Sequence, residues 1–297
     1  MTSGFSAVPP DRALKFEVIR HELDGLLTVF GNKLEREWPK QWASLPSPMV
    51  YMRGTVLLTE NTFNSIRFLA ADTPQNPSRK LEFGISVLPL ARTILDSVFT
   101  VAFLFEDLPT RWSWFLKSGW REQRNELERY RTEYGTDSDW TDWLQQNQEL
   151  LDWLKTEAPI TPAEEADATK LIRWWPNPGK MANQVTDTRL QADLRYLNDW
   201  FYREMSAASH LSWTGFAKQA GHLLKVPDAE RDDTLKKYRS DGFFTAITLV
   251  LALLSEIQIA CRFEDGLDAR LKYLWGIVAA YWGDADALYK RRYAELL

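Results

Sequence analysis

The stretch Phe243–Leu254, FFTAITLVLALL, is the longest apolar segment of this 297-residue chain. Ser255 and Glu256 follow it directly, so the run falls short of the roughly 20 residues that cross a bilayer. A buried helix is therefore the better interpretation. A second apolar run, 83–105, is interrupted by a proline, an arginine and an aspartate. We expect neither segment to span a membrane.

Apolar residues recur at helical spacing on both sides of this stretch, whereas long alternation of apolar and polar residues, the pattern of a β-strand, is absent. The sequence predicts an all-α fold, a multi-helix bundle of about eight longer helices. The expected helices cover 12–38, 50–71, 90–105, 111–134, 140–155, 189–210, 242–263 and 267–296.

Segments that break helices divide the chain. Two of them, 71–80 and 156–188, are rich in proline, and a third, 225–233, is a charged link. Within the second, Thr161 as N-cap and Pro162 at the first helical position predict one short helix over 162–174. We expect a single helical domain over 1–297, with a Pro-rich and Trp-rich insertion or subdomain at 107–188.

Nine of the 14 tryptophans lie between Trp112 and Trp200. They predict either an aromatic platform for bases or sugars, or large anchors that hold otherwise hydrophilic helices together. Their scattered spacing favours the anchors.

Charge and composition exclude several classes of protein. A net charge of −5 argues against a broad nucleic-acid-binding surface. A single cysteine, Cys261, excludes a disulfide framework and a multi-cysteine zinc site. The motifs of phosphate-binding loops, dinucleotide folds, hydrolase elbows and zincins do not occur. We expect no cofactor and no metal and, because no signal-peptide pattern opens the chain, a cytoplasmic location.

One segment places several polar and titratable side chains along one face of a predicted helix. Tyr202, Ser206 and His210 are spaced i, i+4, i+8, and Arg203 lies on nearly the same stripe, three residues before Ser206. A base, a hydroxyl and a cation could converge there. The alternative is a polar seam that satisfies hydrogen bonds between packed helices.

A second polar pair, Arg92 and Asp96, lies in an apolar helix at i, i+4. If both are buried they must be paired. Either they form an ion pair within the bundle, or they face His210 across a helix interface. In the second case Arg92, Asp96, Ser206 and His210 build one pocket.

These motifs resemble two families. Arg92-x-x-x-Asp96 with Tyr202-x-x-x-Ser206-x-x-x-His210 resembles, over 49–263, a bacterial family of helical proteins known as a domain of unknown function, in which Glu is more usual at the Asp96 position. Arg203-x6-His210 resembles the motif of HEPN domains, helical bundles of RNase toxins and antiviral effectors. HEPN motifs usually have Asn, His or Asp after the arginine, where this chain has Glu204.

The HEPN resemblance implies a metal-independent endoribonuclease of a toxin or phage-defence system. His210 would act as general base on a ribose 2′-hydroxyl, Arg203 would stabilise phosphate charge, and Ser206 or Tyr202 would orient a phosphate oxygen. Its partners would be RNA and a second copy or a partner protein. Two alternatives stay open: a non-catalytic interaction or small-ligand sensor protein with a structural polar seam, and another hydrolase or transferase using Asp96 and His210.

Overall fold

The computed structural model describes residues 10–70, 84, 86–209, 217 and 228–293. Its described part is built of helices without a strand, which confirms the all-α prediction. The chain divides into two compact units. Unit 1 comprises Met1–Glu106 and Met181–Leu297, and unit 2 comprises Asp107–Lys180. The insertion or subdomain expected from the sequence, 107–188, ends eight residues later than unit 2.

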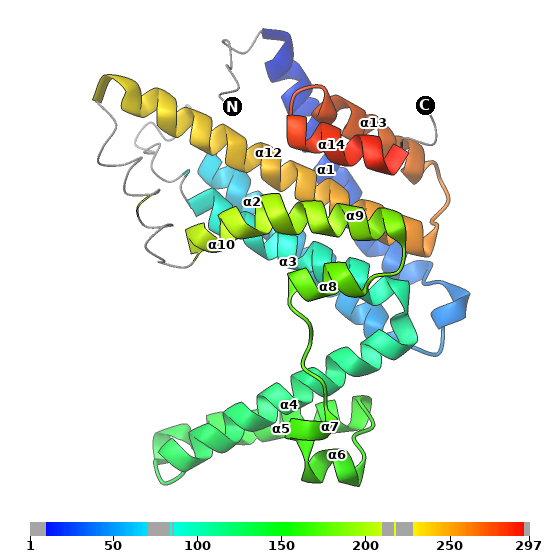
Figure 1. The fold of residues 1–297 in the computed structure, drawn as a ribbon, viewed down its shortest axis with the longest axis vertical. Coiled ribbons are helices and arrows are strands. Elements are labelled where there is room, and N and C mark those ends of the chain that lie inside the picture. Colours follow the sequence, from blue (N-terminus) through cyan, green and yellow to red (C-terminus); the bar gives the residue numbers. More distant parts are fainter. Residues whose placement is uncertain (1–9, 71–83, 85, 210–216, 218–227, 294–297) are drawn as a thin grey trace. The chain divides into compact units, whose positions relative to one another are not determined.

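Unit 1 is organised around one long central helix, α12, Asp228–Cys261, which carries the apolar stretch (Figure 1). It packs along α3, Val87–Glu106, and both contact α2, Pro46–Ala70. The other elements of unit 1 are α1 (Pro10–Arg36), η1 (Lys40–Trp42), α9 (Thr188–Tyr196), η4 (Leu197–Tyr202), α10 (Arg203–Ser209), α13 (Leu267–Ala279) and α14 (Gly283–Tyr293). A short helix, α8 (Pro178–Gln184), begins in unit 2 and ends in unit 1.

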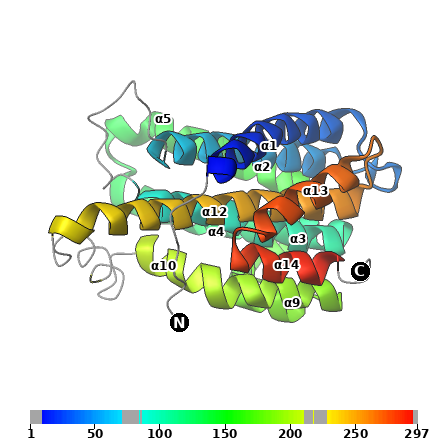
Figure 2. The same ribbon diagram turned by 90° about the horizontal axis from the view of Figure 1, so that it is seen from above.

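The middle of α12 is apolar on all sides because neighbours cover it all round. Every residue from Leu249 to Leu254 is fully buried, and α1, α2, α3 and α13 all contact this helix. Figure 2, the view from above, shows α12 running between α1 and α2 on one side and α9 and α14 on the other. A helix that is apolar all round is the expected core of a bundle.

Two helical segments, Val87–Glu106 and Asp233–Cys261, are long and apolar enough to cross a membrane by length and composition alone. Within the molecule, 61% and 83% of their apolar windows are buried. The core helices of a soluble bundle have the same character, so these two segments are weak evidence for a membrane.

Unit 2 contains α4 (Leu108–Tyr134), η3 (Ser138–Trp140), α5 (Thr141–Glu157), α6 (Pro162–Ala166) and α7 (Ala168–Leu171). Aromatic rings close the turn between α4 and α5, where Tyr134 stacks on Trp140 with ring centroids 4.3 Å apart. Buried Arg121 donates to the Ile172 carbonyl at 2.6 Å and lies 4.0 Å over the Trp174 ring. These rings act as anchors of a polar unit.

Three expected helices are divided or interrupted in the structure. The expected helix 162–174 starts at a Thr161–Glu164 capping box, as its first residues indicate, but Asp167 leaves helical geometry at φ −136° and separates α6 from α7. The expected helix 267–296 is two helices, because α13 ends at Ala279 and α14 begins at Gly283. Asp284 lies in the first turn of α14, where a negative charge stabilises a helix N-terminus. The expected helix 189–210 is interrupted by η4.

The central helix starts earlier than the sequence indicates, at Asp228 rather than near Gly242. Gly242 looks like a helix boundary but lies inside α12, where it permits close packing. A Cβ at this position would lie 2.9 Å from the Cγ1 atom of Val87 on α3. The charged link expected at 225–233 is therefore helical from Asp228 onward.

Candidate functional site

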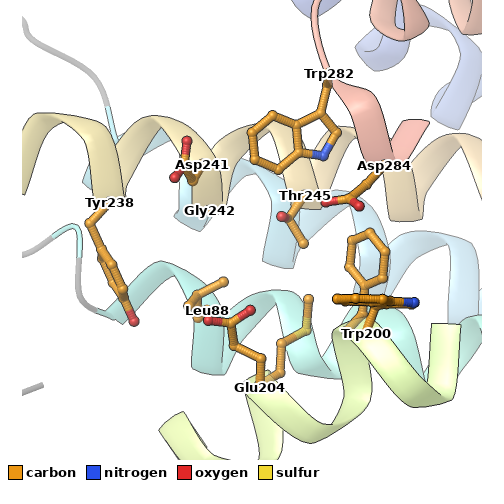
Figure 3. A pocket seen from close by; sticks show the side chains of 11 residues that line it. Leu88, Trp200, Glu204, Tyr238, Asp241, Gly242, Thr245, Trp282 and Asp284 are labelled. Carbon is orange, nitrogen blue, oxygen red and sulfur yellow. The ribbon is translucent and has the colours of Figure 1, made fainter. Parts of the chain in front are cut away.

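A cavity of about 180 Å³ opens in unit 1 among η4, α10, α12 and the start of α14 (Figure 3). Its apolar wall includes Leu88 of α3 and Met205 of α10, and its polar groups come from α10, α12 and α14. Four chain segments that are distant in sequence therefore meet at one hollow.

The element that supplies the aromatic wall is unusual. η4, Leu197–Tyr202, is a π-helix placed between α9 and α10. π-Helical turns are rare, widen the helix by one residue, and occur frequently at functional sites. Here the turn directs Trp200 and Phe201 to the cavity, while the next residue, Tyr202, contacts Arg92 on α3.

Three carboxylates line the cavity, one from each of three helices: Glu204 of α10, Asp241 of α12 and Asp284 of α14 (Figure 3). Burial raises the pKa of Asp241 to about 6, and the negative charges of Glu204 and Asp284 add to this, whereas Lys237 opposes it. Burial, together with Glu204, also raises the pKa of Tyr238 to about 12. The cavity therefore disfavours negative charge on its own side chains.

Aromatic side chains surround these carboxylates. Trp200 is 66% exposed and lies at the cavity, and Trp282 lines it from the α13–α14 link, stacked on Phe244 with ring centroids 5.7 Å apart. Among the described residues, the Nε1 atom of Trp282 is buried without a hydrogen-bond partner. Such unsatisfied groups are uncommon in native proteins and call for an explanation.

Asp284 is fixed in its position by the helix that precedes the π-turn. The hydroxyl of Tyr196 donates to its Oδ1 atom at 2.7 Å, and the guanidinium of Arg291 lies 4.5 Å over the Tyr196 ring. Burial and the Asp284 charge together raise the pKa of Tyr196, so this phenol remains a donor. A carboxylate that accepts one such bond keeps capacity for further donors.

A buried network of charges ties the same helices together. Arg292 of α14 contacts Glu256 of α12 at 2.6 Å and Asp193 of α9 at 3.2 Å, and Arg189 adds a paired contact to Glu256 at 3.1 Å. The side chains of Arg292, Asp193 and Glu256 are at most 5% exposed. The network holds two positive and two negative charges and is neutral as a whole.

Burial alone would raise the pKa of Glu256, but Arg292 and Arg189 hold it below its usual range. Burial raises the pKa of Asp193, and Glu256 adds to this although Arg292 opposes it. One carboxylate oxygen of Asp193 accepts no hydrogen bond from the residues that the structure describes. The network fixes α9, α12 and α14, which continue directly into the walls of the cavity.

The residues predicted from the sequence lie partly together. Arg92 contacts Asp96 at 3.1 Å, and its guanidinium lies 3.8 Å over the ring of Tyr202 on the neighbouring element. Asp96 is half-exposed, and burial raises its pKa although Arg92 opposes the shift. Phe99 meets the Tyr202 ring edge-on at 6.2 Å. Arg92 and Tyr202 thus join α3 to the π-turn by an ion pair and a cation–π contact.

The remaining predicted residues lie on or beyond α10. Arg203 is 75% exposed and 3.6 Å from Asp199, and Ser206 is half-buried on the same helix. His210 lies outside the described residues, so its expected pocket with Arg92, Asp96 and Ser206 stays a prediction.

Sequence reasoning missed the cavity carboxylates and the buried network. Glu256 does carry a sequence signal, because it follows the longest apolar run after one serine and is itself followed by more apolar residues. A charge at such a position must find a partner inside the protein. Glu204, Asp241 and Asp284 lie among other charged residues and carry no comparable signal.

Within the part of the chain that the structure describes, no group of three or more His, Cys, Asp or Glu side chains is arranged to hold a metal ion. Comparison with protein-family models, with curated proteins and with solved structures gives no match.

Proposed function

We propose that this protein is a non-catalytic small-ligand sensor whose cavity binds an organic cation. The observation that carries the proposal is the meeting of Glu204, Asp241 and Asp284 in one cavity walled by Trp200 and Trp282. Carboxylates accept hydrogen bonds from ammonium groups, and the faces of aromatic rings attract cations. Both kinds of group favour positive charge at the same place.

The electrostatics of the cavity support a cation. Burial raises the pKa of Asp241 to about 6, with two neighbouring carboxylates adding to the shift and Lys237 opposing it, so a further positive charge would stabilise the ionised form. A bound ammonium would supply that charge and lower the pKa again. Perturbed titratable groups in a cleft are typical of functional sites.

The size of the cavity limits the ligand. A volume of about 180 Å³ corresponds to roughly six water molecules at about 30 Å³ each. This space suits a short amine and excludes a folded peptide or a nucleic-acid strand. The ligand is therefore a small molecule.

Ligand-observed NMR and thermal unfolding test this proposal with n-butylammonium and the neutral n-butanol. We expect the ammonium to bind and to stabilise the protein, by about 2.7 kcal/mol at a concentration 100 times its Kd, and n-butanol to have little effect. Asp241→Asn and Glu204→Gln should each weaken binding of the ammonium. Asp233→Asn, on the same α12 but 85% exposed, is the matched control. Equal binding of the two probes would contradict a cation site.

The HEPN-like endoribonuclease is a second candidate, and the exposure of Arg203 favours it because a phosphate-binding cation must be accessible. Under this proposal Arg203→Ala and His210→Ala each abolish RNA cleavage and leave the fold intact, with losses on the order of 10²-fold or more. A wild-type protein that cleaves no RNA with or without chelator would remove this candidate.

A further inference from the structure

The kind of cation that the cavity takes can be defined more closely, and this step rests on the proposed function. We infer that the ligand is a small quaternary ammonium compound, whose methyl groups lie against the rings of Trp200, Phe201 and Trp282. The charge of its nitrogen is attracted by Asp284 and by the aromatic rings. The cation is thus held without N–H donors of its own.

Aromatic rings gather at the end of the cavity where Asp284 lies. Figure 3 shows Asp284 between Trp282 and Trp200, and all three residues line the cavity. Phe201 lines it as well, and its ring centroid lies 6.1 Å from that of Tyr196, the residue whose hydroxyl binds Asp284. Three aromatic side chains therefore accompany one carboxylate.

Contacts outside the cavity hold these rings in place. Trp282 is stacked on Phe244 with ring planes 9° apart, and Tyr196 contacts Trp200 with ring centroids 6.4 Å apart. Trp200 is nevertheless 66% exposed, so much of its surface can contact a ligand. Rings that are fixed before the ligand arrives reduce the ordering cost of binding.

The hydrogen-bonding capacity of this end disfavours a primary amine. Asp284 already accepts the Tyr196 hydroxyl at its Oδ1 atom, and Thr245, which is 6% exposed, presents one hydroxyl beside it (Figure 3). The indole of Trp282 is a donor and cannot accept from an ammonium. A primary ammonium brings three N–H donors, and each one that is buried without an acceptor costs free energy. A quaternary ammonium brings none and keeps the positive charge.

The lining also suits the methyl groups of such a cation. The faces of aromatic rings attract a positive charge, and rings of this kind form the sites that recognise quaternary ammonium ligands. Leu88 and Met205 add apolar surface to the same cavity. Methyl groups that are buried against this surface contribute to binding through the hydrophobic effect, which a small hydrated ammonium does not do.

Calorimetry on the full chain compares choline with two matched probes. Ethanolamine keeps the charge and lacks the methyl groups, whereas 3,3-dimethylbutan-1-ol keeps the shape and lacks the charge. We expect choline to bind at least about 10-fold more tightly than either probe at pH 7.5. Trp200→Leu should weaken choline binding by about 10-fold, because it removes one ring. Trp153→Leu, which replaces an exposed tryptophan of α5 in unit 2, is the matched control and should leave choline affinity unchanged.

The outcomes separate this inference from the proposed function. Ethanolamine or n-butylammonium binding as tightly as choline would overturn the quaternary ligand and leave the cation site standing. Binding of 3,3-dimethylbutan-1-ol as tight as that of choline would also overturn it, because shape alone would then explain the affinity. Unchanged choline affinity in Trp200→Leu would remove the aromatic contact on which the inference depends. Absence of binding by choline, ethanolamine and n-butylammonium alike would overturn the proposed function itself.

Discussion

The fold places Asp241 in surroundings that disfavour its ionised form. In an unfolded chain its pKa is near 3.8, and burial with Glu204 and Asp284 raises the folded value to about 6. The folded protein therefore binds a proton at Asp241 more strongly than the unfolded chain does. Its stability must fall as the pH rises through this interval, because the carboxyl group ionises against the preference of its surroundings.

We predict that Asp241→Asn stabilises the protein at pH 7.5. The full shift would correspond to about 3 kcal/mol, but Asp241 is half-exposed and solvent screening reduces the expected gain to about 1 kcal/mol. Thermal unfolding between pH 3.5 and 7.5 measures it. The difference between the two proteins should be small at pH 3.5, where Asp241 is mostly protonated in both the folded and the unfolded state, and it should grow between about pH 4 and 6. A variant less stable than the wild type at pH 7.5 would contradict this account.

For Glu256, which belongs to the buried charge network, we predict a loss of stability on substitution instead of a gain. Glu256→Leu leaves Arg292, which is 3% exposed, without its closest carboxylate, and should lower the free energy of unfolding by about 3–5 kcal/mol. Chemical denaturation measures the loss. Asp286→Asn, which breaks an exposed ion pair with Lys290, should cost less than about 1 kcal/mol. Similar losses in the two variants would show that the network is not buried as described.

At the scale of elements, the contact between α3 and α12 depends on one missing side chain. Gly242→Ala places a methyl group 2.9 Å from Val87 and should destabilise the protein by about 1–3 kcal/mol. Gly54→Ala is the control, because a Cβ there meets nothing within 4 Å, and it should stabilise α2 by about 0.5–1 kcal/mol. Adding Val87→Ala to Gly242→Ala should recover part of the loss. Denaturation midpoints of the four proteins measure these effects, and a neutral Gly242→Ala would refute the close contact.

The sequence predicts the helices well wherever local pattern decides them. The helical periodicity of α1 to α5 and the Thr161 N-cap of α6 are read directly from neighbouring residues. The errors occur where residues distant in sequence determine the local structure. Gly242 resembles a helix boundary in the sequence, but in the fold it allows Val87 of α3 to pack closely against α12. The π-turn of η4 has no signature in its own residues.

The candidate site shows the same limit. The link between Arg92 and Tyr202 joins two residues that the sequence had selected, because both are polar groups in helices that must bury one face. The cavity instead depends on how α10, α12 and α14 converge, and its carboxylates look like surface charges in the sequence. Only packing distinguishes Asp241 from Asp233, two aspartates of one helix.

At the scale of the whole molecule, the two units should differ in what stabilises them. Arg121→Ala removes the buried bond to Ile172 and the contact with Trp174, both within unit 2. We predict a loss of about 2 kcal/mol confined to that unit. Hydrogen exchange followed by mass spectrometry should show faster exchange in 107–180 and unchanged exchange in α12. Arg129→Ala, an exposed arginine on the same α4, is the control, and equal effects in both units would contradict their separation.

The π-turn between α9 and α10 is a place where evolution or design could change the cavity in a single event. A π-helix holds one residue more than an α-helix of the same span, so deleting one residue within 197–202 would restore regular geometry. The helices on both sides would keep their phase, because the extra residue is accommodated within the turn itself. The buried charges of α9 and the position of Glu204 on α10 would then be unchanged, whereas the turn that carries Trp200 and Phe201 would present a different set of side chains to the cavity. One codon would thus alter the aromatic wall and leave the bundle folded.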